Sequence, residues 1–377
     1  MLLESFIDFI NSTGFSHLSW QNVVMMAAGC VFIYLSVKKN YEPMLLLPIG
    51  FGIIIGNIPF IDGLGVNIYE EGSVFNILFE SVHRNIFPPL IFLGIGAMTD
   101  FTALLSNPKT FLLGAAAQAG IFASLLCAYY LGFSIEESAA IGIIGGADGP
   151  TSIYMAMKLA PHLLGPIAMA AYSYMALVPV IQPPLMKLAT SKEERLIRMK
   201  SGRTVKKIEL IIFPIAGFII SALLAPASLP LIGMLFLGNL LKESGVTDRL
   251  AKTAANSIID TSTIIIGVVV GASARGDLFL TWETIKVLLL GCFAFAFSTV
   301  GGVLFVKFIN LFLKNEDKLN PLIGSAGVSA FPAAARVSQM VGREYDKHNH
   351  LLMHAMGANL AGQIASAVAA GILLSFF

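Results

Sequence analysis

The stretch "GGADGP", residues 145–150, interrupts one of the most apolar parts of the chain. It stands between "SAAIGII" (138–144) and "TSIYMAM" (151–157), which are apolar enough to enter a lipid bilayer. Because glycine tolerates either hand of the backbone and proline favours the first turn of a helix, the pattern predicts a break between two half-helices. Asp148 would then place a carboxylate at that break.

Composition puts this stretch in a membrane protein. The 377 residues are 56% hydrophobic and 12% charged, whereas soluble domains carry about 25% charged residues. Apolar runs long enough to cross a bilayer as helices recur from Trp20 to the C-terminus. We therefore expect an all-α polytopic membrane protein, preceded by a surface-lying segment over residues 1–19. The formal net charge of +1 indicates no nucleic-acid partner.

An internal repeat organises the chain. Three pairs of segments match in the same order: "PIGFGIIIGN" (48–57) with "PLIGMLFLGN" (230–239), "GIGAMTD" (94–100) with "GASARGD" (271–277), and "IIGGADG" (143–149) with "LIGSAGV" (322–328). Such matches predict two membrane repeats. The repeats are expected at 20–187 and 208–377, with a basic loop at 188–207 between them.

Loop charges predict the orientation of the repeats. Lys187 to Lys207 contains eight Lys/Arg and only two acids, which places the 188–207 loop in the cytoplasm. The loop that holds Glu70, Glu71 and Glu80 is expected outside, whereas its counterpart in the second repeat is basic and expected inside. Because corresponding loops of the two repeats have opposite charge bias, we expect the repeats to be inverted in the membrane. The protein is expected in the cell inner membrane as a multi-pass protein, with its C-terminus outside.

Counting the crossings predicts two re-entrant hairpins. Residues 138–187 contain two apolar segments, yet their ends are expected on opposite sides of the membrane, so one segment must enter and return. The hairpin 138–159 turns at "GGADGP", and the hairpin 320–343 turns at "GSAGVSAFP". This count gives ten crossings and two hairpins that meet near the midplane. Carriers with inverted repeats bind substrate and ions at such breaks.

Asp148 is the main candidate for chemistry at the break. An unpaired charge at the bilayer centre costs a few kcal/mol or more, so the carboxylate is expected to hold a proton or a cation. Exchange between the two would be a coupling mechanism. The alternative is that Asp148 only caps the second half-helix.

The second half offers neutral oxygen donors of the hard type. They include Asn320, Ser329 and Asn359; Asn359 shares one helix face with Gln363 and Ser366. Interhelical hydrogen bonding is an equal alternative for Asn359. Arg336 could bind an anionic substrate or extend to lipid headgroups.

Two further features of the sequence each allow two interpretations. Tyr174 could donate a proton, or it could simply pack in the core. The motif "AMKL" (156–159) is similar to the lysine hairpin of biotin carriers, but Lys158 lies at the end of a membrane hairpin rather than in a soluble β domain. We expect no covalent biotin on this chain.

Four motifs together resemble a known family. They are "GGADGPTSIY", "AAYSYMALVPVIQPP", "NPLIGSAGVSAFPAAARV" and "LLMHAMGANLAGQIASAVAAG". Nearly the whole chain after Trp20 resembles the β subunit of the sodium-pumping biotin-dependent decarboxylases, which act on oxaloacetate, methylmalonyl-CoA or glutaconyl-CoA. The resemblance implies a membrane subunit that decarboxylates carboxybiotin, exports sodium and takes up a proton from outside. It also implies a carrier-like architecture with an elevator-type rearrangement.

The resemblance also implies roles for individual residues and partners. The essential aspartate of the family matches Asp148, and its functional tyrosine matches Tyr174. Its functional residues of the second half match Asn320, Gly324, Ser329, Arg336 and Asn359. We expect sodium at Asp148, Asn320, Gly324, Ser329 and Asn359, and the carboxybiotin carboxylate at Arg336. Expected partners are biotin-carrier and carboxyltransferase subunits, a small single-span membrane subunit and further copies of this chain.

A second function remains open at this point. Inverted repeats with a carboxylate at the break would equally suit a secondary sodium-coupled carboxylate carrier or a sodium/proton antiporter. A membrane anchor without transport would leave Asp148 without a use.

Overall fold

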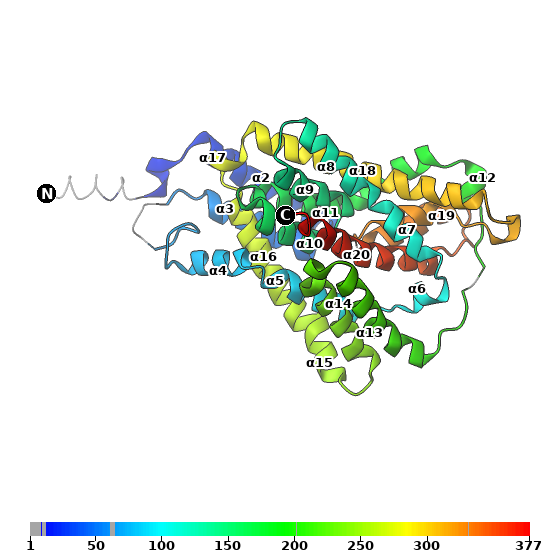
Figure 1. Ribbon diagram of the computed structural model, residues 1–377. Coiled ribbons are helices and arrows are strands. Elements are labelled where there is room, and N and C mark those ends of the chain that lie inside the picture. The colour runs from blue at the N-terminus through cyan, green and yellow to red at the C-terminus, as the bar shows by residue number, and fades with distance from the viewer. Residues whose placement is uncertain (1–8, 10–12, 61–64, 201, 331) are drawn as a thin grey trace.

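The computed structural model describes residue 9 and residues 13–60, 65–200, 202–330 and 332–377 (Figure 1). Its described residues form helices and connecting loops and contain no strand. The all-α expectation is therefore confirmed. The surface helix expected within residues 1–19 lies mostly outside the described residues; the described part contains a short 3₁₀ turn, Gly14–His17.

Seven helical segments of the described chain are long and apolar enough to cross a membrane: Trp20–Lys39, Thr110–Tyr130, Pro161–Ala189, Lys207–Leu224, Asp248–Ser273, Trp282–Asn310 and Leu352–Leu374. Two shorter apolar helices are Pro43–Asn57 and Phe87–Met98. Peripheral and central helices differ in how much of their surface is buried. Only 6% of the apolar window of Lys207–Leu224 is buried, whereas 78% of the window of Leu352–Leu374 is buried. Exposed apolar faces of this size require lipid, so the protein is a multi-pass membrane protein.

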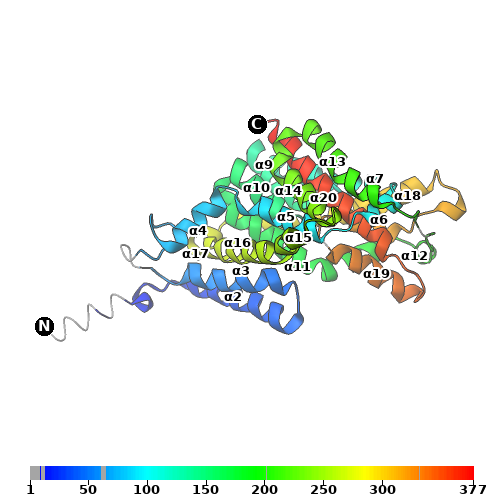
Figure 2. The ribbon, with the colours of Figure 1, turned by 90° about the horizontal axis from the view of Figure 1, so that it is seen from below.

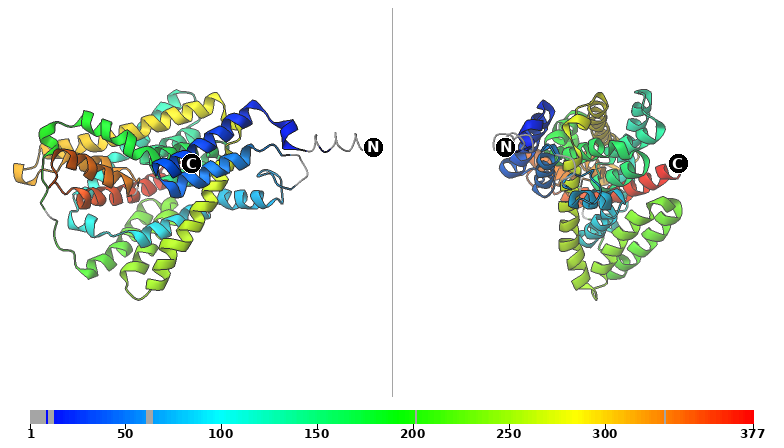
Figure 3. Two further views of the ribbon diagram at one scale, coloured as in Figure 1. Left: turned by 180° about the vertical axis from the view of Figure 1, so that it is seen from behind. Right: turned by 90° about the vertical axis from the view of Figure 1, so that its left-hand side faces the viewer.

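One group of helices forms the flanks of the molecule. Figure 2 shows α2 and α3 side by side on one flank, and Figures 1 and 3 show α13, α14 and α15 together on another. The members of this outer group are α2 (Trp20–Lys39), α3 (Pro43–Asn57), α4 (Val74–His83), α5 (Phe87–Met98), α13 (Lys207–Leu224), α14 (Leu229–Glu243), α15 (Asp248–Thr253), α16 (Ile259–Ser273) and α17 (Gly276–Phe279). One turn of π-helix, Ala254–Ile258, joins α15 to α16.

A second, central group contains α20 (Leu352–Leu374), which is mostly buried and packs against both helix breaks. Its other members are α7 (Thr110–Ala117), α8 (Ala119–Tyr130), α9 (Ile135–Gly142), α10 (Gly149–Leu159), α11 (Leu164–Ala189), α18 (Trp282–Asn310) and α19 (Ala333–Tyr345). Two 3₁₀ segments, Ile143–Gly146 and Pro321–Gly327, belong to it. The short helices α6 (Thr102–Ser106) and α12 (Lys192–Arg195) lie in connections. Both predicted breaks therefore fall in this central group.

The outer group contains two helix pairs, and in each pair an asparagine near the end of one helix hydrogen-bonds a carbonyl just after the other helix. Asn57 ends α3, and its side-chain amide donates to the carbonyl of Ala274, just after α16, at 2.9 Å. Asn239 lies in the last turns of α14, and its amide donates to the carbonyl of Thr99, just after α5, at 3.0 Å. These asparagines end the two matching segments of the sequence repeat. Each pair joins one helix of the first half to one of the second.

Both predicted hairpins fold back on themselves. Glu137 and His162 flank the first one, and their side chains meet at 2.9 Å between Oε1 and Nε2. Asn320 and Asn349 flank the second, and both side-chain amides donate to the carbonyl of Ile197, at 2.8 and 3.2 Å. The two ends of each hairpin therefore lie on the same side of its turn.

Most residues of the basic loop are exposed, but Arg195 anchors the loop to the body of the protein. Arg195 in α12 is only 6% exposed. Its Nε donates to the Thr190 hydroxyl at 2.8 Å, and one terminal nitrogen donates to the carbonyls of Lys187 and Thr190. Figure 1 shows α12 and α19 at one end of the molecule, and α4 and α17 at the other. The basic loop and the acidic segment around α4 thus lie at opposite ends of the molecule.

The structure changes the reason for the break at "GGADGP". The left-handed residue is Ala147, with φ of 52°, whereas Gly145, Gly146 and Gly149 have no positive φ. Our expectation that glycine supplies the unusual backbone conformation there was wrong. Gly149 instead allows a close approach, because a Cβ at this position would collide with the ring of Tyr172.

Candidate ion-binding site between the two helix breaks

The two breaks touch each other at the centre of the molecule. The backbone N–H of Ser329, just after the second 3₁₀ segment, donates to the carbonyl of Gly146 at 2.8 Å. The Ser329 hydroxyl donates to the carbonyl of Gly362 in α20 at 3.1 Å. Helix α20 therefore runs beside both breaks and ties them together.

Asp148 uses its two carboxylate oxygens differently. It is the N-cap of α10, and Oδ1 accepts from the backbone N–H of Thr151 at 3.2 Å. Oδ2 accepts from the Ser366 hydroxyl of α20 at 2.7 Å. The residue is only 5% exposed. The capping role is real, but it occupies one oxygen only; the other is held at the junction of the first break and α20.

Four buried side-chain oxygens without a hydrogen-bond partner belong to residues at or beside the two breaks. They are Thr151 Oγ1, Tyr172 Oη, Gln118 Oε1 and Asn359 Oδ1. The Gln118 oxygen lies close to the first break, because a Cβ added to Gly146 would stand 3.2 Å from it. A buried polar atom without a partner costs about 1–3 kcal/mol. The oxygens of this kind at the two breaks are available to coordinate a bound cation.

Asn359 shows how the structure orients such an oxygen. Its Nδ2 donates to the carbonyls of Ala326 and Val328, at 3.1 and 2.7 Å. Both carbonyls belong to the second break, so the amide nitrogen ties α20 to that break. Since the nitrogen is held in this way, Oδ1 must point elsewhere. The hydrogen-bonding interpretation of Asn359 is therefore confirmed for its nitrogen, and sodium binding by Oδ1 stays a prediction.

Two predicted sodium residues of the second hairpin lie away from Asp148. Asn320 caps the start of the first arm, where Oδ1 accepts from the N–H of Leu322 at 3.0 Å and Nδ2 anchors the basic loop. Gly324 lies in the middle of that arm against α18, where a Cβ would collide with the carbonyl of Gly302. Asp148, Ser329 and Asn359 are the predicted residues that the structure brings together.

Tyr174 and Arg336 also lie apart from the carboxylate. The Tyr174 hydroxyl donates to the carbonyl of Leu288 in α18. Arg336 is exposed on α19. Burial raises the pKa of Glu42, in the α2–α3 connection, and the positive charge of Arg336 opposes that rise. Arg336 therefore lies near the outer group of helices.

Sequence reasoning missed three residues of this site: Gln118, Thr151 and Tyr172. Tyr172 and Tyr174 are two residues apart on α11, so they point to different faces, and the structure places Tyr172 at the break. A polar residue within an apolar run was the available signal for Gln118. Nothing in the sequence could show which face of α11 meets Gly149.

The donor set favours a small hard cation. Carboxylate, amide and hydroxyl oxygens are the ligands of hard cations. Among the described residues, no group of three or more His, Cys, Asp or Glu side chains is placed to hold a metal ion. A single carboxylate with neutral oxygens suits a monovalent ion.

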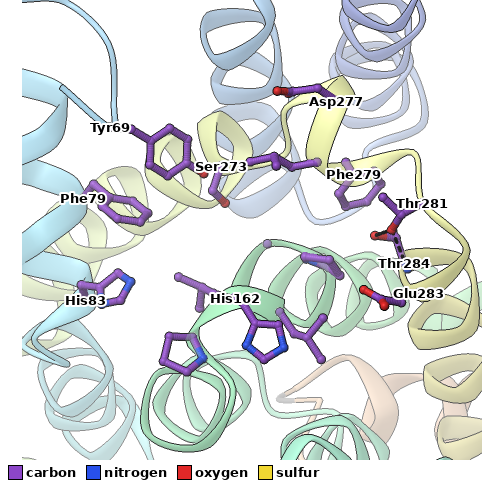
Figure 4. Close-up of a pocket in the computed structure, with 16 residues that line it drawn as sticks. Tyr69, Phe79, His83, His162, Ser273, Asp277, Phe279, Thr281, Glu283 and Thr284 are labelled. Atoms are coloured by element: carbon purple, nitrogen blue, oxygen red, sulfur yellow. Dashed lines mark hydrogen bonds between the residues drawn. The ribbon is translucent and has the colours of Figure 1, made fainter. Parts of the chain in front are cut away.

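Two cavities lie at opposite ends of the central group. The first, of about 580 Å³, we call the aromatic cavity; it has Tyr69, Phe79, His83, His162, Asp277 and Glu283 in its wall. Figure 4 shows an aromatic side formed by Tyr69 and Phe79, with Glu283 opposite it. The second, of about 460 Å³, we call the histidine cavity; it has Thr102, Ser106, Arg198, His348, His350 and His354 in its wall.

Fold and site together define a polytopic helical membrane protein with a buried, oxygen-lined site between two helix breaks. Residues 21–377 match the family model described as the Na+-transporting oxaloacetate decarboxylase beta subunit. The chain belongs to this family, and the resemblance seen in its motifs is confirmed.

Three relatives show how closely the family match extends. Methylmalonyl-CoA decarboxylase subunit beta of Propionigenium modestum is 52% identical over 396 residues, with 100% of both chains covered. Glutaconyl-CoA decarboxylase subunit beta of Acidaminococcus fermentans is 54% identical over 366 residues, covering 97% of this chain and 96% of the relative. Oxaloacetate decarboxylase beta chain of Haemophilus ducreyi is 46% identical over 433 residues, covering 99% of each. The expected enzyme class, a sodium-translocating decarboxylase subunit, is confirmed.

Proposed function

We propose that this subunit decarboxylates carboxybiotin presented by a partner carrier and couples the reaction to sodium export, with uptake of a proton from outside. The observation that carries the proposal is the buried Asp148 carboxylate between two helix breaks, near side-chain oxygens that lack partners. A carboxylate there can hold sodium when it is deprotonated and release sodium when a proton arrives.

The names of the relatives support carboxybiotin as the common intermediate. Three relatives are named for three different acids, yet each is 46–54% identical to this chain over almost its full length. A subunit that bound the acid itself would need a different pocket for each. The proposal assigns the choice of acid to a carboxyltransferase subunit and leaves carboxybiotin to this chain.

The residues take distinct roles in the proposal. Asp148, Asn359 and Ser329 would serve sodium at the break, where Gln118 and Tyr172 add oxygens. Asn320 and Gly324 would act by positioning the hairpin, since one caps its first arm and the other packs that arm on α18.

Arg336 and Tyr174 take the remaining roles. Arg336, exposed near the outer group, would attract the anionic carboxybiotin. Tyr174 would tie α11 to α18 during the cycle, and donation of a proton from its hydroxyl requires release of the Leu288 carbonyl.

The arrangement of helices supports inverted repeats with an elevator-type movement. Asn57 and Asn239 make matching contacts in the two halves, and each hairpin returns to the side from which it starts. We propose that the central group moves against the outer group and carries the site across the membrane. The basic loop would face the cytoplasm in an inner membrane, where carrier and carboxyltransferase subunits dock; a small single-span subunit and further copies would complete the assembly.

The decisive experiment is Asp148→Asn in the full chain, assembled with its partner subunits and reconstituted in vesicles. We expect loss of both carboxybiotin decarboxylation and sodium uptake, because the amide cannot exchange sodium for a proton. The matched control is Asp248→Asn at the exposed start of α15, for which both activities should stay near wild type.

The same vesicles separate the two candidate functions. Sodium-dependent release of CO₂ from free carboxybiotin supports the decarboxylase. Sodium movement that needs no carboxybiotin and releases no CO₂ would identify a secondary carrier or antiporter instead. Near wild-type pumping by Asp148→Asn would refute the coupling role of this carboxylate.

A further inference from the structure

The histidine cavity gathers half of the histidines of the chain. His348, His350 and His354 all line it, and the whole sequence contains six. The three side chains do not form a metal centre, because no described group of His, Cys, Asp or Glu is placed to hold a metal ion. Imidazoles that donate hydrogen bonds, and carry charge when protonated, suit an anionic ligand instead.

Arg198 adds a permanent positive charge to this cavity. Its Nε donates to the Asp346 carboxylate at 2.7 Å. This hydrogen bond lowers the pKa of Asp346, so the pair remains charged down to acidic pH. No hydrogen bond joins the two terminal guanidinium nitrogens of Arg198 to a described residue. A guanidinium held by one nitrogen keeps a two-nitrogen edge for a planar carboxylate.

Hydroxyl groups complete the polar lining. Thr102 lies at the start of α6 and Ser106 at its end. The Ser106 hydroxyl donates to the carbonyl of Ala103 at 3.0 Å, which leaves its lone pairs to accept. A ligand with an N–H donor and a carbonyl acceptor would find complementary partners here. The cavity volume of about 460 Å³ lies within the range of small-molecule sites.

One helix connects this cavity to the ion site. His354 lies in the first turn of α20, Asn359 follows five residues later, and Ser366 hydrogen-bonds Asp148. At 1.5 Å per residue, His354 and Ser366 are about 18 Å apart along the helix axis. The cavity also lies beside the basic loop, at the end of the molecule that faces the proposed carrier. A ligand there can therefore act on the ion site through α20.

We propose that the histidine cavity seats the carboxylated ureido ring of carboxybiotin. The proposal rests on the proposed function and deepens it. Arg198 and His350 bind the carboxylate, the Thr102 hydroxyl donates to the ureido carbonyl, and the Ser106 hydroxyl accepts from the remaining ureido N–H. Arg336 then attracts the carrier, and the histidine cavity holds its head group.

The test measures KM and kcat for free carboxybiotin with the full chain in vesicles at saturating sodium. We expect His350→Gln and Arg198→Gln each to raise KM about tenfold or more, the effect of losing a hydrogen bond to a charged group, while the sodium dependence stays unchanged. His162→Gln in the aromatic cavity is the matched control and should leave KM unchanged. Asp346→Asn frees Arg198 from its ion pair and should change KM less than Arg198→Gln.

A second measurement does not depend on turnover. Met353 lines the cavity and is 56% exposed, so Met353→Cys can be labelled by a maleimide once Cys30, Cys127 and Cys292 are replaced by alanine. In the Asp148→Asn background carboxybiotin stays intact. We expect carboxybiotin to slow the labelling, and inorganic phosphate at equal concentration to leave it unchanged.

The outcomes are separable from failure of the proposed function. If wild type releases CO₂ but His350→Gln and Arg198→Gln keep the wild-type KM, carboxybiotin does not bind in the histidine cavity. The proposed decarboxylase function is then unaffected. Equal protection of Met353→Cys by phosphate would show a general anion site and overturn the proposal. If wild type releases no CO₂ from carboxybiotin, the proposed function itself fails.

Discussion

Asp148 makes two different contacts because its carboxylate has two oxygens. One satisfies the N-terminus of α10, and the other meets Ser366 of α20. Serine or asparagine could perform the first task without a charge. The charge is therefore not needed for the cap, and the proposed cation site gives it a use beside residues that hold buried oxygens without a partner. At this scale the site consists of a few side chains held in place by their nitrogen or backbone contacts.

Gln118 provides a test of this arrangement. Its Nε2 donates to the carbonyls of Gly114 and Gly362, at 3.1 and 3.3 Å, and leaves Oε1 free beside the first break. We expect Gln118→Ala to raise the sodium concentration for half-maximal activity about tenfold, which corresponds to about 1.4 kcal/mol. Sodium-dependent decarboxylation measures this shift.

Gln182 is the matched control for that prediction. It is also a buried glutamine whose Oε1 lacks a partner, but its Nε2 donates to the carbonyl of Ser325, away from Asp148. Gln182→Ala should lower thermal stability without changing the sodium dependence. The same sodium shift in both variants would contradict a specific role for Gln118.

At the scale of elements, the second hairpin depends on a close contact with α18. A Cβ on Gly302 would collide with the carbonyl of Gly324, whereas a Cβ on the neighbouring Gly301 would meet nothing within 4 Å. We expect Gly302→Ala to destabilise the protein by about 1–3 kcal/mol, because the first arm of the hairpin must move. Thermal unfolding in detergent is the measurement.

The adjacent glycine supplies the control. Gly301→Ala should be neutral or slightly stabilising, since alanine is the better helix former and the space is open. Equal loss of stability in both variants would mean that helix propensity, rather than contact with the hairpin, decides the cost.

At the scale of the whole molecule, the proposed movement of the central group against the outer group can be blocked. A Cβ at Gly165, at the start of α11, would stand 3.3 Å from the Ser273 hydroxyl oxygen at the end of α16. The pair Gly165→Cys and Ser273→Cys is therefore close enough for a disulfide between the two groups. We expect oxidation to arrest sodium transport and reduction to restore it, measured in vesicles with the natural cysteines replaced.

Each single cysteine variant, treated with the same oxidant, is the control and should transport normally. Full transport by the cross-linked protein would show that α11 and α16 do not separate during the cycle. The elevator-type proposal would then be wrong, and the site would have to open by movement of the hairpins alone.

Several features could be predicted from sequence because they depend on local chemistry. Apolar length and low charge indicate membrane helices, and Pro150 after a run of glycines indicates a new helix start. The break at Asp148 followed from this reasoning, and the motifs identified the family. Ala147, rather than a glycine, supplies the left-handed turn, because the glycines are needed for close packing.

The sequence by itself determined the membrane class, the two breaks, the place of Asp148 at the first break and the family. Tertiary structure decided which polar groups reach that carboxylate. Ser366 and Gln118 stand far from Asp148 in the chain, Tyr172 rather than Tyr174 faces the break, and Asn320 caps a distant helix end. The physical reason is that helical facing and the fold-back of two hairpins bring these groups together, and a one-dimensional pattern contains neither the rotation of a helix nor its neighbour.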